Sequence, residues 1–178
     1  MKKTILALVL MIISTGVMAQ SPIIESYMKK FKDNKDYTKV SINSEMFSLF
    51  ADLDASEESD KKLLEAISKI EGVKMLIGEQ VESGEAAKLF GEATSKVDKA
   101  GYAELMTVDD ADENIKFSIK RTGGIIKELI MVVGGNKSFM IMNLFGDIDL
   151  NAISKIAGKM DIKGMNKLGN LSKGDNDN

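Results

Sequence analysis

The sequence predicts an α+β domain, with a mainly antiparallel sheet of five or six strands and helices packed on one face. Apolar residues in the first half of the chain recur at helical spacing, whereas four stretches of the second half alternate with a period of two. Pairs of glycines lie at two of the junctions between these stretches. Tight hairpin turns need the positive φ that glycine readily adopts. The second half is therefore expected to form an antiparallel meander.

The first half is expected to contain four helices and two strands. Apolar residues follow a helical period over 21–33, 44–53, 63–70 and 86–97. Pro22 suits the first turn of the earliest helix, and Gly72 stands where the third helix would end. The strands are a short alternating stretch, 38–43, and a compact apolar stretch, 73–78.

The meander is expected to comprise strands at 102–108, 115–121, 125–133 and 138–145. The second strand alternates cleanly, with Ile115, Phe117 and Ile119 on one side and polar residues on the other, so one of its faces should be wet. Two glycine pairs, Gly123-Gly124 and Gly134-Gly135, are expected to be turns. After the meander, the acidic stretch 147–149 should cap a final helix over 150–159.

The last strand of the meander carries the candidate ligand or partner surface. Met140 and Met142 lie on one side of this strand, and Phe139 and Phe145 lie on the other. Because both sides are apolar, the strand is expected to be covered on both faces or to receive a partner.

The chain begins with the pattern of a cleavable secretory signal peptide. Two lysines precede an apolar run, and small residues lead to a cut expected after Ala19. The run is shorter than the roughly 20 residues that a membrane span needs, so no transmembrane anchor is expected. We expect a signal peptide at 1–19, a single domain at 20–165 and a polar, disordered tail at 166–178. The product would be periplasmic or extracellular.

Composition excludes several classes of function. The chain has no cysteine and no histidine, which removes disulfides, thiolate nucleophiles, histidine-dependent triads and most protein zinc sites. The formal net charge is -3, and Arg121 is the only arginine. Such a chain lacks the basic stripe that neutralises phosphates, so nucleic-acid binding is not expected.

The remaining motifs point to structure rather than chemistry. Asp147, Asp149 and Asn151 imitate half of an EF-hand loop, but Ala152 and Gly158 replace the required glycine and glutamate, so helix capping explains them better. The methionines could form a thioether copper(I) site, although core filling is the simpler interpretation. Ser-x-x-Lys spacing at 26–29 and 59–62 lacks the companion motifs of penicillin-recognising enzymes. We therefore expect no catalytic residues, no metal and no cofactor.

Several short segments resemble a known family. They are Val40-Ser41-Ile42 leading to Ser44-Glu45-Met46-Phe47, the Ile70-Glu71-Gly72-Val73 joint, the meander from Tyr102 to Phe145, and the exit Gly146-Asp147-Ile148-Asp149-Leu150. Together with the signal peptide they resemble the DUF4252 family of uncharacterised exported Bacteroidetes proteins. The resemblance implies no activity and no catalytic residues. Many members look like lipoproteins, whereas this chain lacks the cysteine that would be acylated.

These observations favour a non-enzymatic exported envelope protein that binds a protein or a small apolar ligand through its sheet. Two alternatives remain open at this point. One is a carboxylate-dependent hydrolase that acts on envelope polysaccharide, which would show two facing carboxylates in a pocket. The other is a self-assembling structural subunit, which would pair open sheet edges between copies.

Overall fold

The computed structural model describes residues 21–51, 58–82 and 84–153. The predicted signal peptide and the predicted tail at 166–178 lie outside these residues, as does most of the predicted final helix. The elements are α2 (Pro22–Lys30), β1 (Tyr37–Asn43), α3 (Ser44–Ala51), α4 (Glu58–Ser68), β2 (Ile70–Gly78), α5 (Glu85–Lys99), β3 (Ala103–Asp109), β4 (Glu113–Thr122), β5 (Ile125–Gly135) and β6 (Phe139–Ile148).

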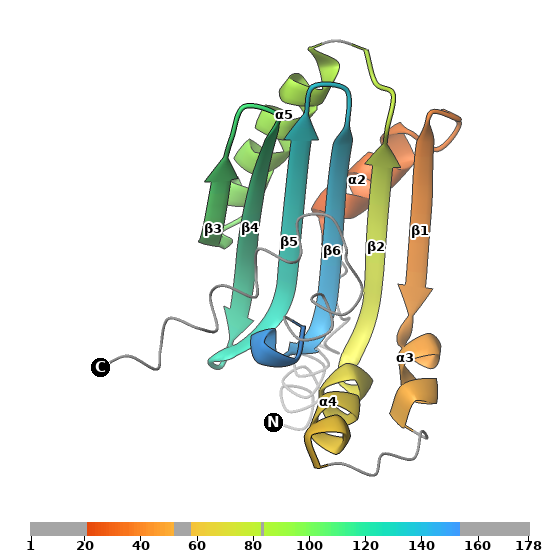
Figure 1. Cartoon of the computed structure of the whole chain (residues 1–178), viewed down its shortest axis with the longest axis vertical. Helices are drawn as coiled ribbons and strands as arrows, with labels where there is room; N and C mark the ends of the chain where they lie inside the picture. Colours follow the sequence, from red (N-terminus) through yellow and green to blue (C-terminus); the bar gives the residue numbers. More distant parts are fainter. Residues whose placement is uncertain (1–20, 52–57, 83, 154–178) are drawn as a thin grey trace, which may run out of the picture.

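The six strands form one antiparallel sheet, which confirms the predicted fold class. Their order is β1-β2-β6-β5-β4-β3 (Figure 1). Strands β3 to β6 make the predicted meander, and Gly123 and Gly124 take positive φ at the β4–β5 turn. The β1–β2 pair joins this meander at β6, so β6 lies in the middle of the sheet with β2 on one side and β5 on the other.

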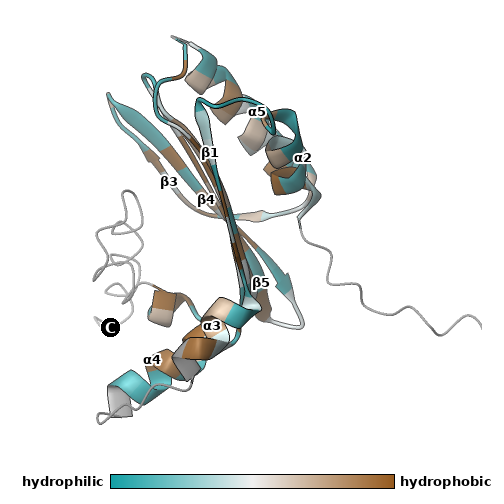
Figure 2. Cartoon of the chain, turned by 90° about the vertical axis from the view of Figure 1, so that its right-hand side faces the viewer, coloured by the Kyte–Doolittle hydropathy of each residue, from teal (hydrophilic) through white to brown (hydrophobic). Residues whose placement is uncertain are grey.

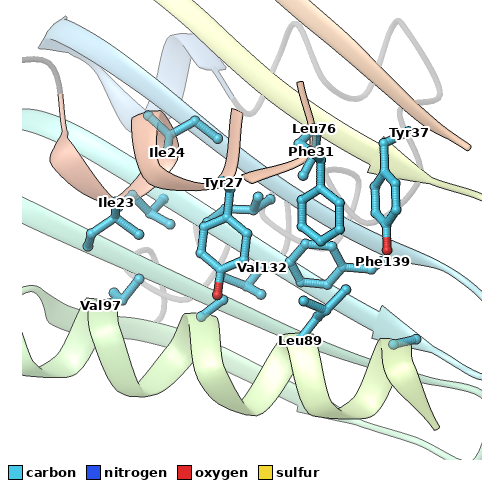
Figure 3. Packing of buried hydrophobic residues seen from close by; sticks show 14 of the residues in the cluster. Ile23, Ile24, Tyr27, Phe31, Tyr37, Leu76, Leu89, Val97, Val132 and Phe139 are labelled. Carbon is cyan, nitrogen blue, oxygen red and sulfur yellow. The ribbon is translucent and has the colours of Figure 1, made fainter. Parts of the chain in front are cut away.

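Helices α2 and α5 cover one face of the sheet, the helix-covered face (Figure 2). Helix α5 packs against β5 and β6, and α2 packs against β2 and β6. Their apolar sides meet the strands in an aromatic-rich cluster, in which Tyr27 lies 5.8 Å from Phe139 and Phe31 stacks 4.0 Å from Tyr37, measured between ring centroids (Figure 3). Close-packed rings of this kind fix the position of α2 on the sheet.

Helices α3 and α4 do not belong to this layer. They pack against each other and against β2, and they extend from the end of the sheet on the side away from α2 and α5 (Figure 2). Phe47 of α3 packs into a second apolar cluster, which lies on the other face of the sheet. Both faces of the sheet are therefore apolar over the central strands.

Two glycine predictions were wrong. Gly72 lies inside β2 rather than at the end of α4, and Gly134 and Gly135 lie inside β5 rather than in a turn. Aromatic rings pack against two of these strand glycines. A Cβ atom at Gly72 would approach the Phe145 ring to 2.4 Å, and one at Gly134 would approach Phe90 to 2.6 Å. The glycines make room for rings, a use that a local sequence pattern does not reveal.

The prediction that one face of β4 is exposed to solvent was only partly right. Its apolar side chains lie on the second cluster's face, and its polar side lies on the helix-covered face. There Lys120 is exposed, but Ser118 is buried and Lys116 pairs with Asp98 of α5 at 2.8 Å. This hydrogen bond raises the pKa of Lys116 despite its partial burial.

In the part of the chain that the structure describes, no helix is long and apolar enough to cross a membrane.

Candidate functional site

The structure divides the predicted ligand or partner surface between the two faces of β6. Phe139 is fully buried in the helix-covered cluster, and Phe145 lies half-buried over Gly72. Met140 and Met142 belong to the cluster on the opposite face. The four residues therefore form no single surface. The binding role predicted for these four residues stays a prediction.

The face that carries these two methionines, the methionine face, is apolar across all six strands. The pairing register places one continuous row of side chains across it, and further apolar rows flank that row. The central row is Val40, Met75, Met142, Met131, Phe117 and Met106. The flanking residues are Ile42, Val73, Leu144, Leu129 and Ile119 on one side, and Ile77, Met140, Val133, Ile115 and Val108 on the other.

Four of the six side chains in the central row are methionines. Only Met140 and Met142 are neighbours in the sequence, whereas Met75, Met106 and Met131 are distant from them and carry no local signal of the row. Thioethers are polarisable and flexible, and surfaces rich in methionine adapt to differently shaped apolar partners. They are also soft ligands for copper(I). The row mixes them with Val40 and Phe117, and this mixture favours apolar packing.

Exposure differs across the methionine face. Over β4 and β5 the side chains are buried, whereas Val40, Ile42, Val73 and Met75 on β1 and β2 are half-buried. Next to these four residues, α3 exposes two large apolar side chains, Met46 at 50% and Leu49 at 63%. We call these six residues the β1–β2 strip. An apolar area that is continuous and partly solvent-accessible is typical of an interaction site.

A buried polar cluster on the helix-covered face is the second candidate. Tyr102 donates a hydrogen bond to Glu128 at 2.6 Å, and Asn143 donates to the same carboxylate oxygen at 3.3 Å. The Tyr102 hydroxyl also lies 3.1 Å from the hydroxyl of Ser21, which therefore donates to it. Burial raises the pKa of Tyr102 well above its ordinary value, and the bond to Glu128 raises it further. Tyr102 thus stays a neutral donor.

This polar cluster positions the start of α2 rather than a substrate. Ser21, directly before α2, is fully buried, and Tyr102 links it to β5 through Glu128. One oxygen of the Glu128 carboxylate already accepts two hydrogen bonds within the protein. Each of these contacts therefore has a structural explanation, which is the positioning of α2.

The other sequence candidates for chemistry also have structural partners. Asp147 pairs with Lys127, and Asp149 accepts hydrogen bonds from the backbone of Asn151 and Ala152, which confirms its capping role. Ser26 bonds the carbonyl oxygen of Ile23 in its own helix. Among the described residues, no group of three or more carboxylates could hold a metal ion.

Comparison with known proteins identifies one family. A family model described as a domain of unknown function, DUF4252, matches residues 27–156, which run from α2 through all six strands. No curated protein and no solved structure matches the chain.

Proposed function

The chain belongs to the DUF4252 family, and we propose that it is a non-catalytic exported protein that binds an apolar segment of another protein through the β1–β2 strip. The observation that carries this proposal is the half-exposure of Val40, Ile42, Val73 and Met75, side by side on two neighbouring strands. A soluble domain normally buries such a group, so a partner that covers it gains the free energy of removing apolar surface from water.

The surroundings of the strip favour a protein segment as the occupant. Strand β1 is the edge strand at this end of the described sheet. An extended segment could pair with its backbone while its alternate side chains contact the strip, as in recognition by strand addition. Met46 and Leu49 of α3 extend the apolar area beyond the end of the strand. The two methionines of the strip, Met46 and Met75, allow the surface to adjust to the segment.

Export rests on the first 19 residues, whose charged, apolar and small-residue regions follow the order of a signal peptide. N-terminal sequencing of the protein recovered outside the cytoplasm of its source cells tests this part. The expected first residue is Gln20. A protein that retains Met1 and stays in the cytoplasm would contradict export without affecting the binding proposal.

The binding proposal is tested with a pair of adjacent substitutions on β1. The full chain is used to capture proteins from envelope extract, alongside Val40→Asp and Ser41→Asp. Val40 lies on the methionine face, whereas Ser41 is exposed on the opposite face of the same strand. The proposal expects one stoichiometric protein that is retained by the unaltered chain and by Ser41→Asp but lost with Val40→Asp.

The captured protein is then purified and titrated against the three chains, each shown to be folded by circular dichroism. The expected result is an affinity at least about tenfold weaker for Val40→Asp, equivalent to about 1.4 kcal/mol. Equal affinity for both variants would exclude the strip as the site. If a small apolar molecule is lost with Val40→Asp and no protein is, the proposed class of partner is wrong.

A further inference from the structure

The centre of the methionine face is fully buried, although the described helices pack on other parts of the sheet. Ile115, Phe117, Leu129 and Met131 are each 0% exposed. Helices α2 and α5 pack on the opposite face, and α3 packs on β1 and β2 (Figures 1 and 2). Neighbours within a sheet shield the flanks of a side chain, but only a second layer removes its outer surface from water.

The chain leaves the described structure on this same face. Asp149 caps a helical turn that begins at Leu150, and the turn brings Ile153 into the apolar cluster with Ile148. Ile153 is 7% exposed. The residues that follow therefore start on the methionine face, at the end of the β5–β6 pair where Ile148 lies opposite Ile126.

The sequence after Ile153 has the composition that such a covering layer needs. Ile156, Met160, Ile162, Met165 and Leu168 are spaced among polar residues, lysines and three glycines up to Leu171, and only the end of the chain, 172–178, lacks an apolar side chain. Residues 154–171 would span about 27 Å as a helix. Six strands spaced at about 4.8 Å cover about 24 Å, so the stretch is long enough to cross the sheet.

We propose that residues 154–171 pack across the centre of the methionine face, over β4, β5 and β6. Their apolar side chains would contact Phe117, Met131 and Met142, and their lysines would face the solvent. This inference does not depend on the proposed function, because the β1–β2 strip lies to one side of the area that the segment covers. The family match ends at residue 156, so the proposal concerns a part of the chain beyond the matched region.

The methionines provide the test. Methionine methyl groups of the full chain are labelled with carbon-13, and a nitroxide is attached to Lys159→Cys, the only thiol in an otherwise cysteine-free chain. The proposal expects the nitroxide to broaden the signals of Met131 and Met142 beyond detection. Met28, which packs with the helix-covered cluster, is the control and should keep its signal. Reducing the nitroxide should restore every signal.

Each other outcome overturns the proposal. If Met131 and Met142 keep their signals, the segment does not cover the centre of the face. If Met28 is broadened instead, the segment lies on the helix-covered face. Mixing nitroxide-bearing chains without carbon-13 with labelled chains without nitroxide distinguishes a second copy. If the signals of Met131 and Met142 are still broadened in this mixture, the cover belongs to another molecule.

A second measurement uses thiol protection and adjacent positions on β5. Met131→Cys and Val132→Cys place a thiol on the methionine face and on the helix-covered face, respectively. Adding Ile156→Asp and Met160→Asp should speed alkylation of the thiol at 131 by about tenfold or more, because local opening governs access to buried sites. The thiol at 132 should stay protected. Unchanged protection at 131 would contradict the proposal.

Discussion

The two faces of the single sheet are both apolar, but they are built differently. The helix-covered face combines close-packed rings, such as Tyr27 against Phe139, with a buried hydrogen-bonded cluster around Tyr102. The methionine face has four methionines and Phe117 in its central row. Rings and directed hydrogen bonds fix one arrangement, whereas flexible thioethers tolerate several. The difference teaches that one sheet can have a rigid side that holds its helices and a more adaptable side, which is the side where we propose that a partner binds.

The largest effect should come from breaking the rigid side. Phe139→Ala removes a fully buried ring that packs against Tyr27, so the free energy of unfolding should fall by about 3–5 kcal/mol. Denaturant titration of the full chain measures this loss. Met140→Ala, one residue along and half-buried on the other face, is the control and should cost less. Equal losses would show that the two faces do not differ in this way.

The buried hydroxyl of Tyr102 should have the next largest effect. Tyr102→Phe removes the donor to Glu128, which keeps its longer bond from Asn143, and leaves Ser21 without the Tyr102 hydroxyl, at a cost of about 1–3 kcal/mol. Tyr37→Phe is the control, because its bond to Glu85 is long, at 3.5 Å, and should contribute less. The comparison is made by thermal and denaturant unfolding. A larger loss for Tyr37→Phe would contradict the structural role given to the cluster.

Alkaline pH should weaken the helix-covered face selectively. Burial raises the pKa of Tyr27 to about 12, and the nearby Glu92 adds to the shift. The unfolded chain releases this proton near pH 10 while the folded chain keeps it, so the stabilisation is complete below pH 10 and is lost as the pH rises toward 12. Between pH 10 and pH 12, the ionisation of Tyr27 should lower the free energy of unfolding by about 1.4 kcal/mol per pH unit.

The pH dependence is measured by denaturant titration at a series of pH values above 9. Tyr27→Phe should make the decline shallower, because the substituted side chain no longer ionises. An unchanged slope would show that Tyr27 ionises equally readily in the folded and unfolded chains.

The smallest effect should come from conservative change on the methionine face. Met131→Leu keeps the volume of the side chain and its apolar character, so the free energy of unfolding should change by less than about 1.5 kcal/mol. Denaturant titration checks this value, with Leu89→Met on the helix-covered face as the reverse substitution for comparison. A loss of several kcal/mol for Met131→Leu would show that this face is as closely fitted as the other.

The sequence by itself determined the local elements. The period of two predicted the meander, and the glycine pair at 123–124 predicted its β4–β5 hairpin, because positive φ is a local property of the backbone. The capping role of Asp149 was likewise predictable, since the carboxylate bonds amides only a few residues away. The apolar character of both sides of 138–145 predicted that this strand is covered on both faces or receives a partner, and the structure places it in the middle of the sheet with an apolar cluster on each face.

Only the tertiary structure decided which residues meet. The roles of Gly72 and Gly134 depend on rings from distant segments, and the methionine row depends on the register of strands that are far apart in the sequence. The link from Ser21 through Tyr102 to Glu128 likewise joins three separate elements. A periodic pattern specifies which residues share a face of one strand, but strand order and register decide their neighbours, because those follow from burying both faces of the whole sheet.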